Sequence, residues 1–369
     1  MVDERAQSAI QGLLDELVAS GAEVGLQVAV IHDGRVVVDA TSGVADAATG
    51  EAVSADTLFY AASTAKGVAS TVAHALVACG ELDYDLRAVD VWPEFGAHGK
   101  EQVSLRHALL HTAGVPGLPG ETTVADLCDW DRMCAVLADA EPWWEPGTRF
   151  GYHALTFGFL VGEILRRATG RTISELLREV ITEPLGIEHD VHFAVPRPLL
   201  SRVARQVGSE AGAPPPPAPG TPLDRAIPPG VRIDAAIANR ADVLSAAIPS
   251  AGTMTARGAA RIYSALLGQV EGVELVPPQR LSDMAAIAYR GIDEVMGFET
   301  QWAFGYSPYR PAGDAGREGS TIGMVGANGS AAYADIDSGV AVALMRNRFT
   351  AGDLTALQQV DRVVADNFS

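Results

Sequence analysis

Ser63 and Lys66 lie three positions apart, and of all residue pairs in this sequence their types and spacing are the most suggestive of chemistry. They stand where an extended, aromatic-rich stretch passes into a helical pattern, so one helical turn places both side chains on the same face. A serine hydroxyl becomes a good nucleophile when a base takes its proton, and an amine can be that base when burial lowers its pKa. The pattern therefore predicts an acyl-transfer centre on Ser63.

A plainer interpretation of the same residues stays open. Ser63 could simply cap a helix, and Lys66 could be a solvated cation in its first turn. Because four-residue matches of this kind arise by chance, the surrounding sequence has to decide between the two interpretations.

The composition excludes several classes of protein. The chain has 369 residues, enough for roughly two domains, and its 48% hydrophobic and 20% charged content is typical of a globular protein. Its formal net charge of −19 should repel nucleic acid and anionic membranes. No apolar stretch approaches the length of a membrane span, and the first residues lack the pattern of a secretory signal. We therefore expect a cytoplasmic protein that binds neither nucleic acid nor membranes.

Strand patterns gather at the two ends of the chain, and helical patterns fill the middle. The expected end elements are a helix over 4–20, a hairpin of strands over 24–31 and 35–41 around Asp33-Gly34, a helix over 255–267, a strand near 301–307, a second hairpin over 330–334 and 340–345, and a last helix over 353–368. The expected middle helices cover 103–111, 124–138, 155–168 and 173–181. A proline-rich stretch over 213–220 predicts an extended surface loop.

This arrangement predicts an α+β fold with an antiparallel sheet flanked by helices. Residues 1–79 and 245–369 would form the sheet domain, and residues 80–244 would form an inserted, mainly helical domain. Ser63 lies near the junction of the two. Ligands usually bind in clefts at such junctions, so the junction is the expected place for a site.

Four further motifs follow the serine motif in order along the chain. They are Leu109-Leu110-His111-Thr112-Ala113-Gly114, Trp144-Glu145-Pro146-Gly147, Tyr152-His153-Ala154 and Pro249-Ser250-Ala251-Gly252. With them, the chain resembles the serine β-lactamase and penicillin-binding-protein superfamily over roughly residues 5–365, and most of all its class C-like (family VIII) carboxylesterases. The resemblance implies the same fold, and a mechanism in which a serine is acylated and the acyl group then passes to water or another acceptor.

The resemblance also implies roles for individual residues. Ser63 would be the nucleophile, Lys66 would help to deprotonate it, and Tyr152 would act as phenolic base and acid beside Lys66. The backbone N–H groups of Ser63 and Ala327 would form the oxyanion hole. By the same analogy, the residues expected to contact substrate are Trp144, Tyr306, Met324 and Gly326.

Two positions depart from the family pattern. Ala154 stands where β-lactamases carry an asparagine whose amide contacts substrate, and this loss favours esters over β-lactams. Met324 stands in the third motif where a lysine or histidine is usual, and a thioether cannot donate a hydrogen bond. The oxyanion hole uses backbone groups, so a methionine at position 324 leaves it intact. We therefore expect Met324 to alter which substrate the protein accepts and not to abolish the chemistry.

Two pairs of histidines invite a metal-site interpretation, His107 with His111 and His189 with His192. Neither pair has the neighbouring acid and third ligand of a zinc site, so we expect no metal. His111 is better explained as a brace for the His-Thr-Ala-Gly turn. The acyl-transfer chemistry requires no cofactor.

The prediction is a serine hydrolase that acts through an acyl-enzyme on Ser63, with small or medium carboxylic esters as substrates. Two alternatives use the same centre: an acyltransferase to an alcohol or amine, and an amidase or D-aminopeptidase. A third alternative is a non-catalytic protein that binds a ligand, for which Met324 and Ala154 are the evidence. In the catalytic interpretations the partner is a small-molecule ester or amide.

Overall fold

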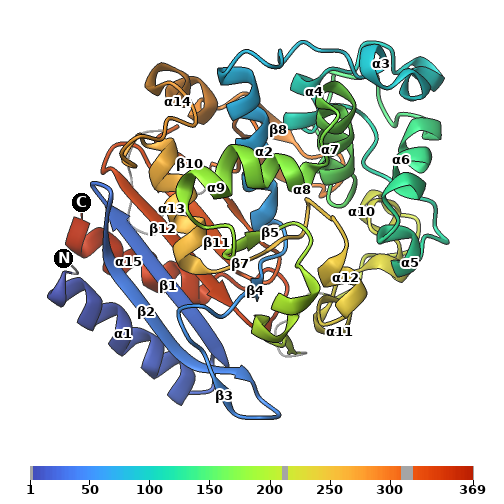
Figure 1. Cartoon of the computed structure of the whole chain (residues 1–369). Helices are drawn as coiled ribbons and strands as arrows, with labels where there is room; N and C mark the ends of the chain where they lie inside the picture. The colour runs from blue at the N-terminus through green and yellow to red at the C-terminus, as the bar shows by residue number, and fades with distance from the viewer. Residues whose placement is uncertain (1–2, 210–214, 309–318, 369) are drawn as a thin grey trace.

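The computed structural model describes residues 3–209, 215–308 and 319–368. Its main element is a six-stranded antiparallel sheet built from both ends of the chain (Figure 1). In spatial order the strands are β10 (Thr321–Val325), β11 (Ala331–Asp335), β12 (Val340–Arg346), β1 (Gly25–His32), β2 (Arg35–Asp46) and β3 (Glu51–Ala52). The predicted α+β sheet assembled from the two termini is confirmed.

The two faces of the sheet pack against different helices, because alternate residues of a strand point to opposite sides. Val28 and Val30 of β1 belong to the apolar cluster that includes α1 (Glu4–Ala19) and α15 (Thr355–Phe368). Ala29 and Ile31 belong to the larger cluster that includes α2 (Thr64–Ala78) and α13 (Ala256–Leu266). Figure 1 shows α1 and α15 on one side of the sheet and α13 on the other.

The β1–β2 hairpin has the turn that its sequence predicts. Asp33 and Gly34 both adopt positive φ, at 49° and 72°, which is the backbone conformation that a two-residue turn of this type requires. Glycine is also needed at position 34 for space, because a Cβ there would lie 2.3 Å from the carbonyl oxygen of Gln269. The second predicted hairpin is confirmed as β11 and β12.

The middle of the chain is helical and lies beside the sheet domain, at the upper right of Figure 1. Its helices are α3 (Ala88–Val91), α4 (Leu105–Leu109), α5 (Val124–Leu127), α6 (Trp130–Asp139), α7 (Thr156–Thr169), α8 (Ile173–Leu176), α9 (Glu183–Leu185), α10 (Pro222–Ala226), α11 (Ala235–Ala238) and α12 (Ala241–Ser245). Two short strands of this region, β5 (Val191–His192) and β6 (Val207–Gly208), pair with β7 (Thr253–Met254) and β13 (Arg348–Phe349). The later part of the expected insertion is therefore hydrogen-bonded to segments outside it.

Four predicted elements differ from the structure. The helix expected over 173–181 is α-helical over Ile173–Leu176 and continues as a π-helix over Leu177–Thr182. The helix expected over 124–138 is two helices, because the Asp129 carboxylate accepts the Arg132 N–H at 3.0 Å and caps a new start. The helix expected over 103–111 stops at Leu109, and His111 has a φ of 56°, which a right-handed helix does not allow.

The strand expected near 301–307 is β9 (Glu299–Trp302), which pairs with β8 (Tyr289–Ile292). Beyond Trp302 the strand ends, and the backbone carbonyls of Phe304 and Gly305 accept hydrogen bonds from side chains of α2 instead of from a neighbouring strand. Ser70 Oγ donates to the Gly305 carbonyl at 2.7 Å, and His74 Nε2 lies 2.9 Å from the Phe304 carbonyl oxygen. Helix α14 (Pro278–Ala285) precedes this hairpin.

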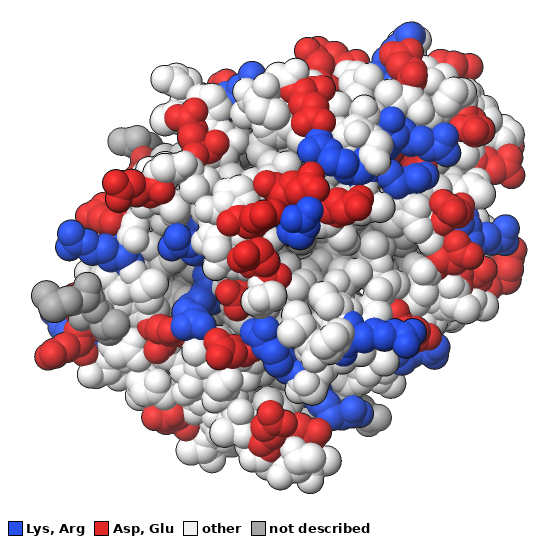
Figure 2. Space-filling model, viewed as in Figure 1, with Lys and Arg blue, Asp and Glu red and all other residues white. Residues whose placement is uncertain are grey.

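Two further findings concern the surface and the helix lengths. In the proline-rich stretch, Ala213 and Pro214 lie outside the described residues, and 215–218 form an irregular, largely exposed loop. Among the residues that the structure describes, no helix has both the length and the apolar character needed to cross a membrane. Figure 2 shows acidic and basic side chains interspersed on the face of Figure 1, without a broad patch of one sign.

Candidate active site

Ser63 lies at an abrupt turn between a strand and a buried helix. Strand β4 (Phe59–Tyr60) pairs with β7, Ala62 then takes a φ of 46°, and α2 begins at Thr64. The Ser63 side chain makes no capping hydrogen bond to the start of α2. This removes the plain helix-cap interpretation and leaves the Ser63 hydroxyl available to other groups.

Lys66 is fully buried and points at the serine. Its Nζ donates to Ser63 Oγ at 2.9 Å and to the Ser250 carbonyl oxygen at 3.4 Å, and its exposed fraction is 0%. Burial lowers its pKa to about 7, because a charged ammonium loses its hydration there. No acidic side chain of the described residues forms an ion pair with Lys66. An amine that loses its proton near neutral pH thus contacts the predicted nucleophile.

Tyr152 lies beside the same lysine, in the loop that leads into α7. The Lys66 Nζ is 5.0 Å from the centre of the Tyr152 ring. Burial raises the pKa of the phenol, and Ser63 opposes that rise only in part. The structure thus brings together the three side chains that the sequence predicted.

Asp293 holds Tyr152 in place, and sequence reasoning missed it. Its Oδ1 accepts the backbone N–H groups of Tyr152 at 3.1 Å, Val295 at 2.8 Å and Met296 at 3.0 Å. The residue is 3% exposed, and burial raises the pKa of its carboxyl. Asp293 is 141 positions from Tyr152 on the β8–β9 hairpin, so no local pattern could have found the contact.

Comparison with known proteins places this geometry in a family. The family model described as Beta-lactamase matches residues 10–365. The chain belongs to the β-lactamase family. It is 31% identical over 355 residues to the esterase/β-lactamase LipL of Mycobacterium tuberculosis. The matched region covers 88% of this chain and 77% of that protein.

Two solved structures are similar over nearly the whole chain. A family VIII carboxylesterase has a TM-score of 0.87 and 30% identity, with 99% of this chain and 98% of that chain covered. A penicillin-binding-protein homologue from Caulobacter crescentus has a TM-score of 0.87 and 34% identity, with 99% and 97% covered. The predicted resemblance and fold are confirmed, and the chain is a serine hydrolase of the β-lactamase family.

The third family motif lies on β10 and in the loop that follows it. A Cβ on Gly326 would lie 2.4 Å from the Ala61 carbonyl oxygen and 3.1 Å from Thr64 Oγ1, so this loop presses against the start of α2. Asn328 Nδ2 also donates to the Tyr60 carbonyl oxygen at 2.9 Å. The loop is thereby fixed to the residues on both sides of Ser63, and Ala327 within it is exposed.

Met324 fills the motif position where the family usually has a cation. Its side chain is 4% exposed and packs in an apolar cluster with Phe150 and Trp302, which Tyr152 borders. The surroundings of Tyr152 are therefore apolar at the position where the family pattern has a cation. An ammonium at this position would have to be buried among aromatic rings at a large desolvation cost.

Trp144 and Tyr306, which the family analogy placed at the substrate, are both buried. Trp144 is 8% exposed, and its Nε1 donates to the Thr112 carbonyl oxygen at 3.3 Å. Tyr306 is 0% exposed, and its hydroxyl lies 2.9 Å from Thr71 Oγ1 on α2. Both side chains therefore offer a substrate little or no surface.

His111 has a bracing role beside Tyr152. Its Nδ1 accepts the His153 backbone N–H at 3.0 Å, and its ring lies 5.0 Å from the Tyr152 ring and 4.7 Å from the Phe157 ring. Burial holds the His111 pKa well below its usual value, so the ring is neutral. Over the described ranges, the structure has no group of three or more His, Cys, Asp or Glu side chains placed to hold a metal ion.

Proposed function

We propose that this protein is a carboxylesterase that forms an acyl-enzyme on Ser63. One observation carries the proposal: Lys66 is buried without an acidic partner among the described residues, and its Nζ is 2.9 Å from Ser63 Oγ. With a pKa of about 7, a large share of Lys66 is neutral at physiological pH and can accept the serine proton.

The different pKa shifts divide the proton transfers between Lys66 and Tyr152. Neutral Lys66 takes the proton of Ser63 as its Oγ attacks the ester carbonyl carbon. Tyr152, whose pKa is raised, stays protonated at neutral pH and gives its proton to the leaving alkoxide as the C–O bond breaks. The proton on Lys66 then passes to the Tyr152 phenolate, and attack by water releases the carboxylic acid and restores Ser63.

The oxyanion of each tetrahedral intermediate would be held by the backbone N–H groups of Ser63 and Ala327. The loop that contains Ala327 is fixed to the residues around Ser63 through Gly326 and Asn328, which supports this assignment. Each such donor contributes on the order of a hundredfold or more in rate. A methionine in place of the motif cation leaves this arrangement intact, since only backbone groups are involved.

The substrate that fits best is an uncharged ester. The buried apolar cluster of Met324, Phe150 and Trp302 takes the place of the family's motif cation, so this position offers no charge for a substrate carboxylate. The esterase/β-lactamase relative and the family VIII carboxylesterase structure also favour ester chemistry. Transfer to an alcohol or amine, and hydrolysis of an amide, would use the same acyl-enzyme and differ only in acceptor or leaving group.

The experiment that tests the proposal compares wild type with Ser63→Ala on a short-chain p-nitrophenyl ester, with intact mass recorded during turnover. Wild type should release nitrophenol and gain an acyl mass, and Ser63→Ala should do neither, with activity lower by about three orders of magnitude or more. The melting temperatures of the two proteins should agree. Equal activity in the two proteins would contradict the role of Ser63, and added alcohols or amines in the assay identify the preferred acceptor.

A further inference from the structure

Exposed apolar side chains are concentrated on one hairpin beside the catalytic tyrosine. In the described part of the chain, four large apolar residues are at least 36% exposed. Three of them, Ile292 at 50%, Met296 at 36% and Phe298 at 55%, lie at the tip of the β8–β9 hairpin. The fourth, Val36 at 36%, is at the start of β2 in the sheet domain. Such clustering on a folded surface usually marks a place where something apolar binds.

The hairpin tip is held rigidly, so these side chains are exposed in a fixed arrangement. The Asp293 N–H donates to the Phe298 carbonyl at 3.0 Å, and the Gly297 N–H donates to the Asp293 carbonyl at 2.8 Å. The Asp293 carboxylate binds the N–H groups of Val295 and Met296. Val295 is 3% exposed and packs in the same apolar cluster as Trp144. Pre-ordered apolar groups bind a ligand at low entropic cost.

The base of the hairpin is part of the wall of the active site. Tyr289 of β8 pairs with Trp302 of β9, and the Trp302 ring is 5.9 Å from the Tyr152 ring. Trp302 shares the apolar cluster of Met324 and Phe150. The same Asp293 that orders the tip also binds the Tyr152 N–H. The base of the hairpin therefore packs beside the catalytic tyrosine, and its tip carries the exposed apolar side chains.

This surface is too small and too close to acids for a protein or lipid partner. A stable protein interface buries about 800 Å² on each side, far more than three side chains present. Glu294 and Glu299 flank the apolar residues, and the whole chain carries a net charge of −19, which opposes binding to anionic lipid. The apolar part of the substrate itself is the occupant that fits.

We propose that the hairpin tip, defined by Ile292, Met296 and Phe298, binds the apolar chain of the ester's alcohol. This inference rests on the proposed function. Tyr152 is the group that protonates the leaving alcohol, and the hairpin is bonded to the backbone N–H of Tyr152 through Asp293, so we place the tip on the leaving-group side of the site. The enzyme thus selects esters of longer-chain alcohols.

The test compares kcat/KM for ethyl, butyl and hexyl acetate, each kept below its solubility limit. Burial of one methylene is worth about 0.8 kcal/mol, or roughly fourfold, and partial burial about twofold. Wild type should therefore prefer hexyl over ethyl acetate by at least about tenfold. The triple variant Ile292→Ser, Met296→Ser, Phe298→Ser should lose most of that preference. Val36→Ser, at a matched exposure on a distant strand, should keep the wild-type ratio, and melting temperatures check that both variants fold.

Three results would overturn the inference. The triple variant could keep the wild-type hexyl-to-ethyl ratio. The triple variant could instead lose the preference for longer acyl chains, measured on a series of ethyl esters, as strongly as it loses the preference for longer alcohols. That result would place the acyl chain on the hairpin. The triple variant could also differ from wild type only above the concentration at which the ester aggregates, which would mean docking to a surface. A wild type that is inactive on every ester would overturn the proposed function, and this inference with it.

Discussion

Two regions of the molecule differ in how their polar groups are paired, and one of them has the properties of an active centre. The first is a hollow of about 900 Å³ between the sheet domain and the segment that follows the middle helices. Four arginines or histidines and four acids line it: Arg202, Arg205, Arg257, His189, Asp46, Glu51, Asp56 and Asp190. The second is the Ser63 centre, which contains one lysine, one phenol and one hydroxyl.

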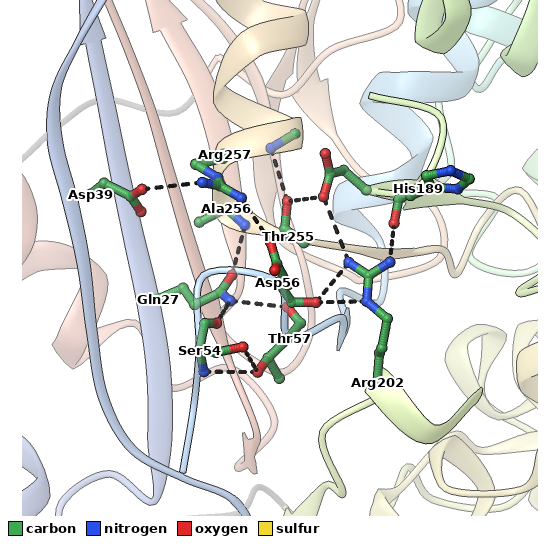
Figure 3. A network of polar contacts seen from close by, with 12 residues as sticks. Gln27, Asp39, Ser54, Asp56, Thr57, His189, Arg202, Thr255, Ala256 and Arg257 are labelled. Atoms are coloured by element: carbon green, nitrogen blue, oxygen red, sulfur yellow. Dashed lines mark hydrogen bonds and ion pairs between the residues drawn. The ribbon is translucent and has the colours of Figure 1, made fainter. Parts of the chain in front are cut away.

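In the hollow, the main charged groups are paired (Figure 3). The Arg202 guanidinium donates to the Asp56 carbonyl at 3.0 and 2.8 Å and to the His189 carbonyl at 2.9 Å. Arg257 lies 2.9 Å from an Asp56 oxygen and 3.6 Å from an Asp39 oxygen. These contacts connect three stretches of chain that are distant in sequence. The network is best explained as a structural tie, which braces the segment leading into β4.

At Ser63 the opposite holds, because the amine is deeply buried and has no carboxylate beside it among the described residues. Its pKa is lowered to about 7 by burial alone. Titratable groups whose pKa is shifted and which have no oppositely charged partner are characteristic of catalytic sites. Networks of paired charges are characteristic of structural sites. The number of charged residues around a hollow is therefore a poor guide to function in this protein, and the state of each group is a better one.

The largest effect that would sharpen this comparison is in the pH dependence of activity. Because the Lys66 pKa is lowered to about 7, the amine gains its proton below that pH and can no longer act as a base. We expect kcat/KM to fall about tenfold per pH unit below pH 7, so about a hundredfold by pH 5. The raised pKa of Tyr152 should leave the profile flat between about pH 8 and 10. Initial rates over pH 5–10 measure both limbs.

A second group could produce the same acidic limb, and it supplies the control. Burial raises the pKa of the Glu23 carboxyl to about 7, although Arg346 lies 2.7 Å away and opposes the rise. Glu23 is in the sheet domain and does not contact Ser63. A Glu23→Gln variant should therefore keep the acidic limb. If that variant loses the limb, the assignment of the base to Lys66 is wrong.

A medium effect is expected in the hollow, on stability and not on catalysis. Arg202→Met removes three hydrogen bonds to backbone carbonyls and should cost about 1–3 kcal/mol, since part of this site is open to water. The melting temperature should fall, while kcat/KM measured well below it should stay within about threefold. The matched control is Arg205→Met, because Arg205 lines the same hollow and forms no ion pair within the described ranges. A large loss of activity in folded Arg202→Met would show that the network is coupled to Ser63.

The sequence predicted the parts of the fold that local contacts determine. The β1–β2 hairpin depends on the conformations of Asp33 and Gly34 themselves, so it could be predicted from that pair. The segment after Trp302 could not, because hydrogen bonds from Ser70 and His74 on α2 replace those of a strand. Distant partners of this kind leave no periodic signal in the segment they act on.

The same distinction applies to the candidate site. Ser63 and Lys66 are one helical turn apart and were found by spacing, and Tyr152 was found by its place in an ordered motif. Asp293 acts through the backbone of a residue far away in the sequence, so only the fold reveals it. The burial of Tyr306 is likewise set by packing against α2, which the family analogy did not convey.

The smallest effect concerns an unpaired hydroxyl beneath the helix that carries Lys66. Tyr263 is fully buried, and its hydroxyl has no hydrogen-bond partner within the part of the chain that the structure describes. A Cβ on Gly67 would lie 2.2 Å from that hydroxyl oxygen. Because a buried hydroxyl without a partner is unfavourable, Tyr263→Phe should leave stability unchanged or raise it by up to about 1 kcal/mol.

The same contact makes Gly67 a test of that prediction. Gly67→Ala alone should destabilise by about 1–3 kcal/mol through overpacking, and the cost should be smaller in the double variant with Tyr263→Phe, where the hydroxyl is gone. Urea unfolding of the four proteins gives the coupling free energy directly. Additive costs would mean that the two residues do not press on each other, and a clear loss of stability in Tyr263→Phe alone would mean that the hydroxyl has a partner. Coupling between the two substitutions would show that the Tyr263 hydroxyl presses on Gly67 and so limits which residue α2 can carry at that position.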